Sequence, residues 1–135
     1  MSLLLKGRAI WRGYAEGEAL TTSQPISFYG GVDPETGKIV EKGHELEGET
    51  IAGRILVFPY GKGSTVGSYV LLRLKKRGLA PKAIINLRCE PIIAVGAIIA
   101  EIPCIDEIDI SKVSTGDIVR IDGSRVEIRK RESDP

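Results

Sequence analysis

The sequence predicts an α/β domain in which strand, helix, strand and helix alternate in the middle of the chain. Two apolar segments, 53–60 and 81–87, have the continuous hydrophobic character of buried strands. Each precedes a segment with helical character, 64–78 and 91–102. Strand-like segments with turn signals flank this middle part. The order of elements favours a barrel-like or layered α/β arrangement.

Length and charge narrow the class of protein. The 135 residues are enough for a core, and no repeat or linker divides them, so we expect one domain over 1–135 with a frayed tail at about 131–135. Nineteen basic and 18 acidic residues give a net charge of +1, which argues against nucleic-acid binding. No apolar run is long enough to span a bilayer, and the N-terminal one is too short for a secretory signal, so we expect a cytoplasmic protein.

The first third of the chain mixes strand and loop signals. Residues 3–22 combine β-forming residues with three glycines, which predicts short strands with bulges or bends. Residues 25–48 are rich in glycine and predict a long structured loop with one short strand at 38–40. Loops of this length in a compact domain are often functional, and the alternative is a surface excursion without a role.

The first predicted helix follows the first buried strand. Ser64 is the expected N-cap, and Val66, Val70 and Leu74 lie four residues apart on one face. Gly78 follows a basic last turn, as a helix stop does.

The last third predicts a second helix and a hairpin. Segment 91–102 opens with a proline suited to a first turn, and because it is apolar nearly all round we expect a buried helix that ends before Pro103. Segment 117–130 predicts a hairpin with a type I′ turn at Asp122 and Gly123.

Potential metal ligands are scarce. Cys89 and Cys104 are the two cysteines and His44 is the single histidine. An iron–sulfur cluster generally takes three or four thiolates, and the spacing fits no zinc pattern. Any metal that this protein uses must therefore come mostly from elsewhere.

The stretch GKGSTVGS, residues 61–68, lies where a strand ends and a helix begins. The Walker pattern would require a glycine at 56 and a hydroxyl at 63, but these residues are Leu56 and Gly63. The dinucleotide fingerprint also fails, because one residue too many separates Gly63 from Gly67. Nucleotide binding is therefore disfavoured.

Two interpretations of Ser64 remain. In the first, Ser64 only caps the helix. In the second, it is a reactive group at a site where Gly61 and Gly63 let the backbone run close to a ligand and the helix N-terminus favours negative charge. Ser68, one turn further, would extend a hydroxyl-lined patch. Lys62 holds an anion in the second interpretation and is merely solvated in the first.

Other polar residues also have two interpretations. Cys89 and Glu90 follow the second buried strand at its carboxyl end, where α/β sites form, but the sequence favours a buried thiol and a helix-start carboxylate. Asp33 and His44 are candidates for contact with a substrate or a partner, or ordinary surface residues.

Three segments together resemble the small subunit of the archaeal aconitase X-type dehydratases: ISFYGGVDPETGKIVEKGHELEG, GRILVFPYGKGSTVGSYVL and EPIIAVGAIIAEIP. The resemblance covers residues 3–128. It implies a single swivelling β/β/α barrel-like domain, similar to the C-terminal domain of aconitase, that pairs with a large subunit carrying a four-iron four-sulfur cluster.

The resemblance also implies a reaction. A serine of this loop, here Ser64, would be the base that removes a proton from carbon while water leaves (R)-5-phosphomevalonate, giving trans-anhydromevalonate 5-phosphate in the archaeal mevalonate pathway. Aconitase has an arginine two residues beyond this serine, whereas this chain has Val66, so the substrate anion must be held otherwise. The candidate substrate-binding residues are Lys62, Gly63, Thr65, Ser68 and Asp33.

Three alternatives stay open at this point. A dehydratase of the same type acting on cis-3-hydroxy-L-proline would carry similar motifs. A non-catalytic swivelling domain would only dock on its partner, and a nucleotide-binding module would bind nucleotide without one. In the dehydratase interpretation, residues 28–48 and 61–68 should lie at the boundary with the large subunit.

Overall fold

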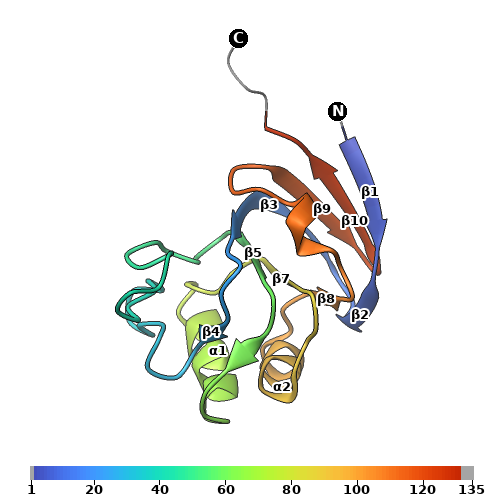
Figure 1. Ribbon diagram of the computed structural model, residues 1–135. Coiled ribbons are helices and arrows are strands. Elements are labelled where there is room, and N and C mark those ends of the chain that lie inside the picture. The colour runs from blue at the N-terminus through green and yellow to red at the C-terminus, as the bar shows by residue number, and fades with distance from the viewer. Residues whose placement is uncertain (1, 132–135) are drawn as a thin grey trace.

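The computed structural model describes residues 2–131 (Figure 1). The predicted frayed tail lies, from residue 132 on, outside the described residues. None of the helices within 2–131 is long and apolar enough to cross a membrane.

Eight strands form one strongly curled sheet in the order β1-β10-β9-β3-β5-β7-β8-β2. Strands β1, β10, β9 and the first part of β3 pair antiparallel. The end of β3 pairs parallel with β5, β5 with β7, and β7 with β8. The bounds of these strands are β1 Ser2–Lys6, β2 Arg8–Trp11, β3 Tyr14–Thr21, β5 Ile55–Phe58, β7 Ala83–Asn86, β8 Cys104–Asp106, β9 Ile118–Asp122 and β10 Arg125–Arg129.

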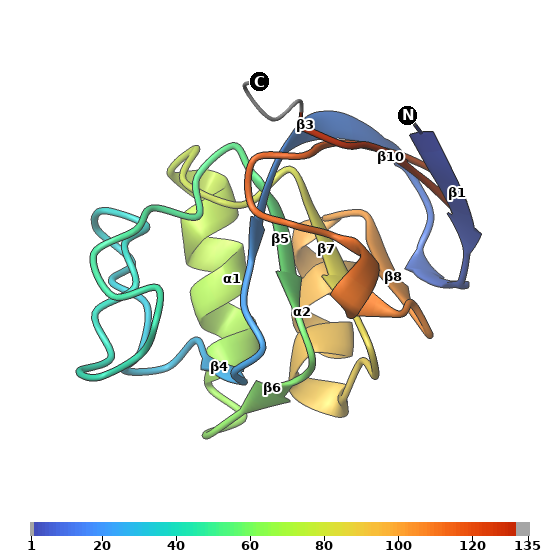
Figure 2. The same cartoon turned by 45° about the horizontal axis from the view of Figure 1, so that its top comes forward.

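The two ends of this sheet are joined by a single glycine. Strands β1 and β2 lie at opposite ends of the strand order, yet only Gly7 separates them in the chain. A Cβ atom at Gly7 would lie 2.3 Å from the carbonyl oxygen of Asp106, so only glycine allows this crossing. The sheet is therefore rolled, as Figure 2 shows, and the predicted barrel-like α/β fold is confirmed.

Helices α1 (Gly67–Lys76) and α2 (Pro91–Ala100) lie side by side over the parallel half of the sheet (Figure 2). One core cluster fills the space between helices and sheet, and a second is enclosed by the curled sheet itself. Helix α1 ends at Lys76 with Arg77 as its C-cap, and Gly78 follows with φ +73°, so the predicted helix stop is confirmed.

The prediction of a buried α2 is wrong for one side of this helix. Val95, Ile98 and Ile99 expose 48, 44 and 39% of their surface, although Gly96 and Ala97 are buried. Gly96 lets α2 approach α1 so closely that a Cβ there would lie 2.5 Å from Leu71 Cδ1. No further layer of the described chain covers the opposite side, so apolar composition alone did not make the helix buried.

Residues 25–48 form the structured loop that the glycines predicted. The segment begins with β4 (Ile26–Ser27), and the expected strand at 38–40 is reduced to isolated bridges of Val32 with Ile39 and of Lys38 with Thr50. The loop runs beside α1 (Figures 1 and 2) and supplies buried core residues, namely Phe28, Val32, Ile39 and Leu46. It is thus part of the packed structure.

The β9–β10 hairpin is confirmed, but its turn type is not. Asp122 pairs with Arg125, so the two loop residues are Gly123 and Ser124 rather than Asp122 and Gly123. Within the turn only Gly123 has a positive φ, at +63°, which fits a type II′ turn. The pairing register moved the turn by one residue.

A buried carboxylate near this hairpin makes the fold sensitive to acid. Burial by itself raises the pKa of Asp117, but hydrogen bonds from Lys130 Nζ (2.7 Å) and from the backbone N–H groups of Arg131 and Ser114 outweigh it and leave that pKa below the ordinary 3.8. The stabilisation is therefore present above 3.8 and is lost as pH falls through the lower folded-state pKa.

We expect Asp117→Asn to lower the free energy of unfolding at neutral pH by about 2 kcal/mol, because the buried donors lose a charged acceptor. Its unfolding free energy should also fall less steeply than that of the wild type below pH 3.8. Denaturant unfolding across this pH range measures both effects. Equal acid sensitivity of the two proteins would contradict the assignment, and Lys130→Met should behave like Asp117→Asn.

Candidate functional site

The glycine loop begins at the C-terminal end of the buried strand β5. After Phe58 the chain forms β6 (Gly61–Lys62), which pairs parallel with β4, Ile26 opposite Gly61 and Ser27 opposite Lys62. Because the two short strands run parallel, the residues that follow β4 and those that follow β6 start side by side. The sequence did not indicate that residues 26–31 would lie beside the loop.

Two glycines allow the loop to pack between neighbouring segments. Gly63 has φ +92°, and a Cβ there would lie 2.5 Å from Ser27 Oγ. A Cβ at Gly61 would lie 2.5 Å from Glu90 Oε1. Any side chain at either position would push the loop away from β4 or from the start of α2.

Ser64 lies at the exposed end of this loop. Its Oγ accepts a hydrogen bond from the Val66 N–H (3.2 Å), and its carbonyl accepts one from Gly67 (2.9 Å). The N-cap of α1 is nevertheless Val66, two residues after the predicted one, because a turn of i→i+3 bonds precedes the α-helix. Ser64 caps that turn. Val66 is 46% exposed, so it does not share the buried face of Val70 and Leu74.

The start of α1 also leaves backbone donors free. Among the hydrogen bonds of the described residues, none is donated by the backbone N–H of Ser64 or of Thr65. These donors lie at the positive end of the helix dipole. The position beside Ser64 can therefore stabilise a negative charge.

The other two hydroxyls differ in their surroundings. Thr65 is exposed and lines a hollow of about 270 Å³ between the first turns of α1 and α2. Ser68 is 4% exposed, and its Oγ donates to the carbonyl of Ile92 at 2.7 Å. The Ser68 hydroxyl thus ties α1 to α2, and Ser68 also lines the same hollow as Thr65.

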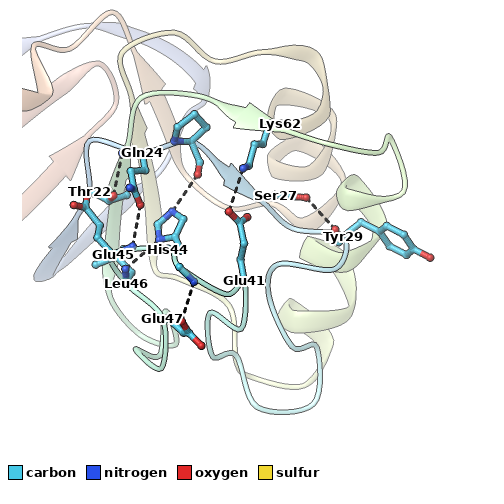
Figure 3. Close-up of polar contacts among 12 residues, drawn as sticks. Thr22, Gln24, Ser27, Tyr29, Glu41, His44, Glu45, Leu46, Glu47 and Lys62 are labelled. Carbon is cyan, nitrogen blue, oxygen red and sulfur yellow. Dashed lines mark hydrogen bonds and ion pairs between the residues drawn. The ribbon is translucent and has the colours of Figure 1, made fainter.

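Lys62 is held by an acidic residue of the long loop. Its Nζ lies 3.1 Å from Glu41 Oε2, and both side chains are partly exposed (Figure 3). An anionic ligand would have to share Lys62 with Glu41. Asp33 uses its Oδ1 to accept the N–H of Glu35 (2.9 Å), and it lines a second hollow, of about 370 Å³, beside α1.

His44 is a structural residue of the long loop. It is 6% exposed, its Nδ1 accepts the Leu46 N–H (3.0 Å), and its Nε2 donates to the Pro25 carbonyl (3.1 Å), as Figure 3 shows. The neighbouring Glu45 accepts hydrogen bonds from the Thr22 hydroxyl and the Ser23 N–H, which lower its pKa. The Nε2 bond holds the loop against the segment after β3, and the Nδ1 bond fixes the backbone of the loop itself.

Glu90 caps the start of α2, which confirms the interpretation of this residue as a helix-start carboxylate. Its two carboxylate oxygens accept the N–H groups of Ile92 and Ile93, both at 2.9 Å. Cys89 Sγ lies 3.8 Å from Cys104 Sγ, and both thiols are free. The hydrogen bond with Cys89, and then burial, raise the pKa of Cys104 well above its ordinary value.

These residues do not fit an iron–sulfur cluster. Two thiols are available where a cluster takes three or four, and Cys104 is fully buried. Residues 2–131 contain no group of three or more histidine, cysteine or acidic side chains placed to hold a metal ion.

One polar cluster was missed in the sequence. Asp106 is 1% exposed and binds Arg8 through both carboxylate oxygens, at 2.8 and 3.0 Å, and this hydrogen bonding raises the pKa of Arg8. The pair lines a cavity of about 590 Å³ at the ends of β7 and β8. The two partners lie 98 positions apart in the chain, and no local pattern in the sequence links them.

Comparison with known proteins gives consistent matches over most of the chain. The family model described as the aconitase X swivel domain matches residues 4–129. The phosphomevalonate dehydratase small subunit of Archaeoglobus fulgidus is 61% identical over 126 residues, 90% of this chain and 95% of the relative. That of Methanosarcina acetivorans is 59% identical over 123 residues, 89% and 85% of the two chains. A crystal structure of Thermococcus kodakaraensis aconitase X in its holo-form matches with a TM-score of 0.93 and 54% identity, covering 95% of this chain and 99% of that chain.

Proposed function

This chain belongs to the aconitase X swivel-domain family, and on that basis we propose that it is the small subunit of a phosphomevalonate dehydratase. The observation that carries the proposal is the 51–61% identity to small subunits of that name over nearly the whole chain. The resemblance noted in the sequence is confirmed. The reaction removes water from (R)-5-phosphomevalonate and gives trans-anhydromevalonate 5-phosphate.

Within this reaction we assign the role of base to Ser64. The proton on the carbon next to the carboxylate passes to the serine alkoxide, and the electron pair of that C–H bond forms the double bond. The hydroxyl leaves the neighbouring carbon with the C–O electron pair, and this hydroxide together with one proton, in net balance the one taken by the serine, makes the water that is eliminated. A serine oxygen is basic enough only as the alkoxide, which needs strong local stabilisation. The exposed position of Ser64, the free amides beside it and the helix dipole support this assignment.

The substrate contacts that we propose follow the same loop. Gly63 and Thr65 flank the base, and Lys62 binds an anionic group of the substrate once it leaves Glu41. Asp33 contributes from the neighbouring hollow. Ser68 acts indirectly, because its bond to Ile92 sets the position of α1 against α2.

The cofactor and the partner are linked. Membership of an aconitase-like family suggests an iron–sulfur enzyme, and the described residues of this chain do not fit the cluster. We therefore propose that a four-iron four-sulfur cluster is carried by the large subunit, whose existence the name of the relatives implies. Cytoplasmic location stays a prediction.

The proposal is tested by co-expressing the chain with its cognate large subunit and assaying the anaerobically purified complex. We expect dehydration of 5-phosphomevalonate by the complex and none by either subunit alone, because the base and the cluster lie on different chains. Turnover of cis-3-hydroxy-L-proline with none of 5-phosphomevalonate would contradict the substrate assignment. Saturable nucleotide binding by the isolated chain would contradict the dehydratase assignment itself.

A further inference from the structure

Twelve large apolar side chains are exposed in the described part of the chain, and most of them lie outside the antiparallel half of the sheet. Of the twelve that are exposed, Leu4, Tyr14 and Ile118 belong to the antiparallel half of the sheet. The other nine lie on the helices, the long loop or the segments that follow β5 and β7: Tyr29, Val40, Tyr60, Val66, Tyr69, Leu87, Val95, Ile98 and Ile99. Single exposed apolar residues are normal on a protein surface, whereas a continuous group marks an interaction site.

The two helices of the same layer differ in their outer faces. Helix α1 has three basic residues in its last turn, Arg73, Lys75 and Lys76. Helix α2 has no charged residue between Pro91 and Ala100, and its outward side chains are Val95, Ile98 and Ile99. A helix on a solvated surface carries polar residues on its outer face. The outer face of α2 therefore has the composition of a buried surface.

Two hollows adjoin the start of α1, and one of them reaches α2. The hollow of about 270 Å³ lies between the first turns of α1 and α2 and reaches Val95. The hollow of about 370 Å³ lies between α1 and the long loop. Val66 and Tyr69 line both, and Val66 is two residues from Ser64. We call Val66, Tyr69, Val95, Ile98 and Ile99 the apolar strip.

We propose that the apolar strip is the docking surface of the large subunit, which seats apolar side chains in both hollows and covers the outer face of α2. The proposal rests on the function proposed above. A partner that completes the site at Ser64 must cover residues 61–68 and thus reaches Val66 and Tyr69. A stable interface needs about 800 Å² on each partner, more than an eight-residue loop offers, and α2 supplies adjoining apolar area.

Charge substitutions on the strip test the proposal directly. Val95→Asp and Tyr69→Asp should each weaken the affinity of the purified chain for the large subunit at least about a hundredfold, because a buried unpaired charge is costly. Leu4→Asp, at a position 66% exposed in the antiparallel half, is the matched control and should leave the affinity unchanged. Wild-type affinity in both strip variants would overturn the proposal.

Hydrogen exchange on the wild-type chain gives a second measurement that needs no variant. Residues 91–100, together with 28–48 and 61–68, should gain protection when the large subunit is added. Protection of the loop segments with unchanged exchange in 91–100 would overturn the strip as docking surface. The proposal would also be overturned if this chain formed a homodimer that Val95→Asp disrupted while the affinity for the large subunit stayed unchanged.

The failures of the two proposals can be told apart. If the wild-type complex assembles but does not dehydrate 5-phosphomevalonate, the proposed function is contradicted. The docking surface is then judged by hydrogen exchange and affinity alone. An active complex with unprotected α2 contradicts the docking surface alone. Absence of any complex would overturn both.

Discussion

Replacing Ser64 with alanine should lower the turnover of the assembled enzyme by at least about a thousandfold, equivalent to about 4 kcal/mol in the barrier. The reason is that proton abstraction from carbon has no easy substitute once the base is gone. The hydroxyl also accepts the Val66 N–H, and losing this cap should cost about 1 kcal/mol of stability. The variant should therefore assemble and keep its cluster. Steady-state kinetics and iron analysis of the same sample measure both outcomes.

Variants at neighbouring positions separate the base from the cap. Ser64→Gly costs only a few tenths of a kcal/mol as a cap, so near-normal turnover in this variant would show that Ser64 is a cap and not a base. Thr65→Ala should lose much less activity than Ser64→Ala. Ser68→Ala removes the bond to Ile92 and should lower stability more than the rate of reaction.

Gly63→Ala should lower turnover about a hundredfold without removing any reacting group. Gly63 has φ +92°, and the added Cβ would lie 2.5 Å from Ser27 Oγ, so the loop must move away from β4. A displacement of about 1 Å of a catalytic group is enough for a loss of this size. The backbone strain should also lower stability by about 1–3 kcal/mol. Kinetics of the complex and thermal unfolding of the chain measure the two effects.

Two controls isolate the contact from the backbone strain. Gly43 has a similar φ of +82° but nothing within 4 Å of an added Cβ, so Gly43→Ala should lose stability and keep its rate. Adding Ser27→Gly to Gly63→Ala removes the obstructing hydroxyl and should restore part of the turnover. Full activity in Gly63→Ala alone would show that the packing of this loop does not position Ser64.

Much of the fold follows from local sequence patterns. Segments 53–60 and 81–87 each contain a short apolar run, which is typical of a strand covered on both faces, and these runs became β5 and β7. Gly78 and the basic last turn placed the end of α1 correctly. The pattern of glycines and hydroxyls after β5 also identified the loop that carries Ser64. These features depend on residues close together in the chain.

Details that depend on pairing between distant segments were not predictable. The register of β9 with β10 moved the hairpin turn to Gly123 and Ser124, and the turn of i→i+3 bonds before α1 moved the cap to Val66. The ion pairs of Lys62 with Glu41 and of Arg8 with Asp106 join residues 21 and 98 positions apart. Local composition contains no information on which of many charges will meet.

By itself, the sequence determined the central alternation of strand and helix, the stop of α1 and the loop that carries Ser64, because each depends on residue type at short spacing. The family, and with it the assignment of Ser64 as base, came from the resemblance of three longer segments. Only the tertiary structure decided that β4 lies beside the glycine loop, that Ser68 faces α2, and that Val66 and the outer side of α2 are exposed. The physical reason is that burial is a property of the layers around an element. The apolar composition of a helix sets how much of its surface can be buried. The neighbouring elements of the same chain determine how much of that surface is covered.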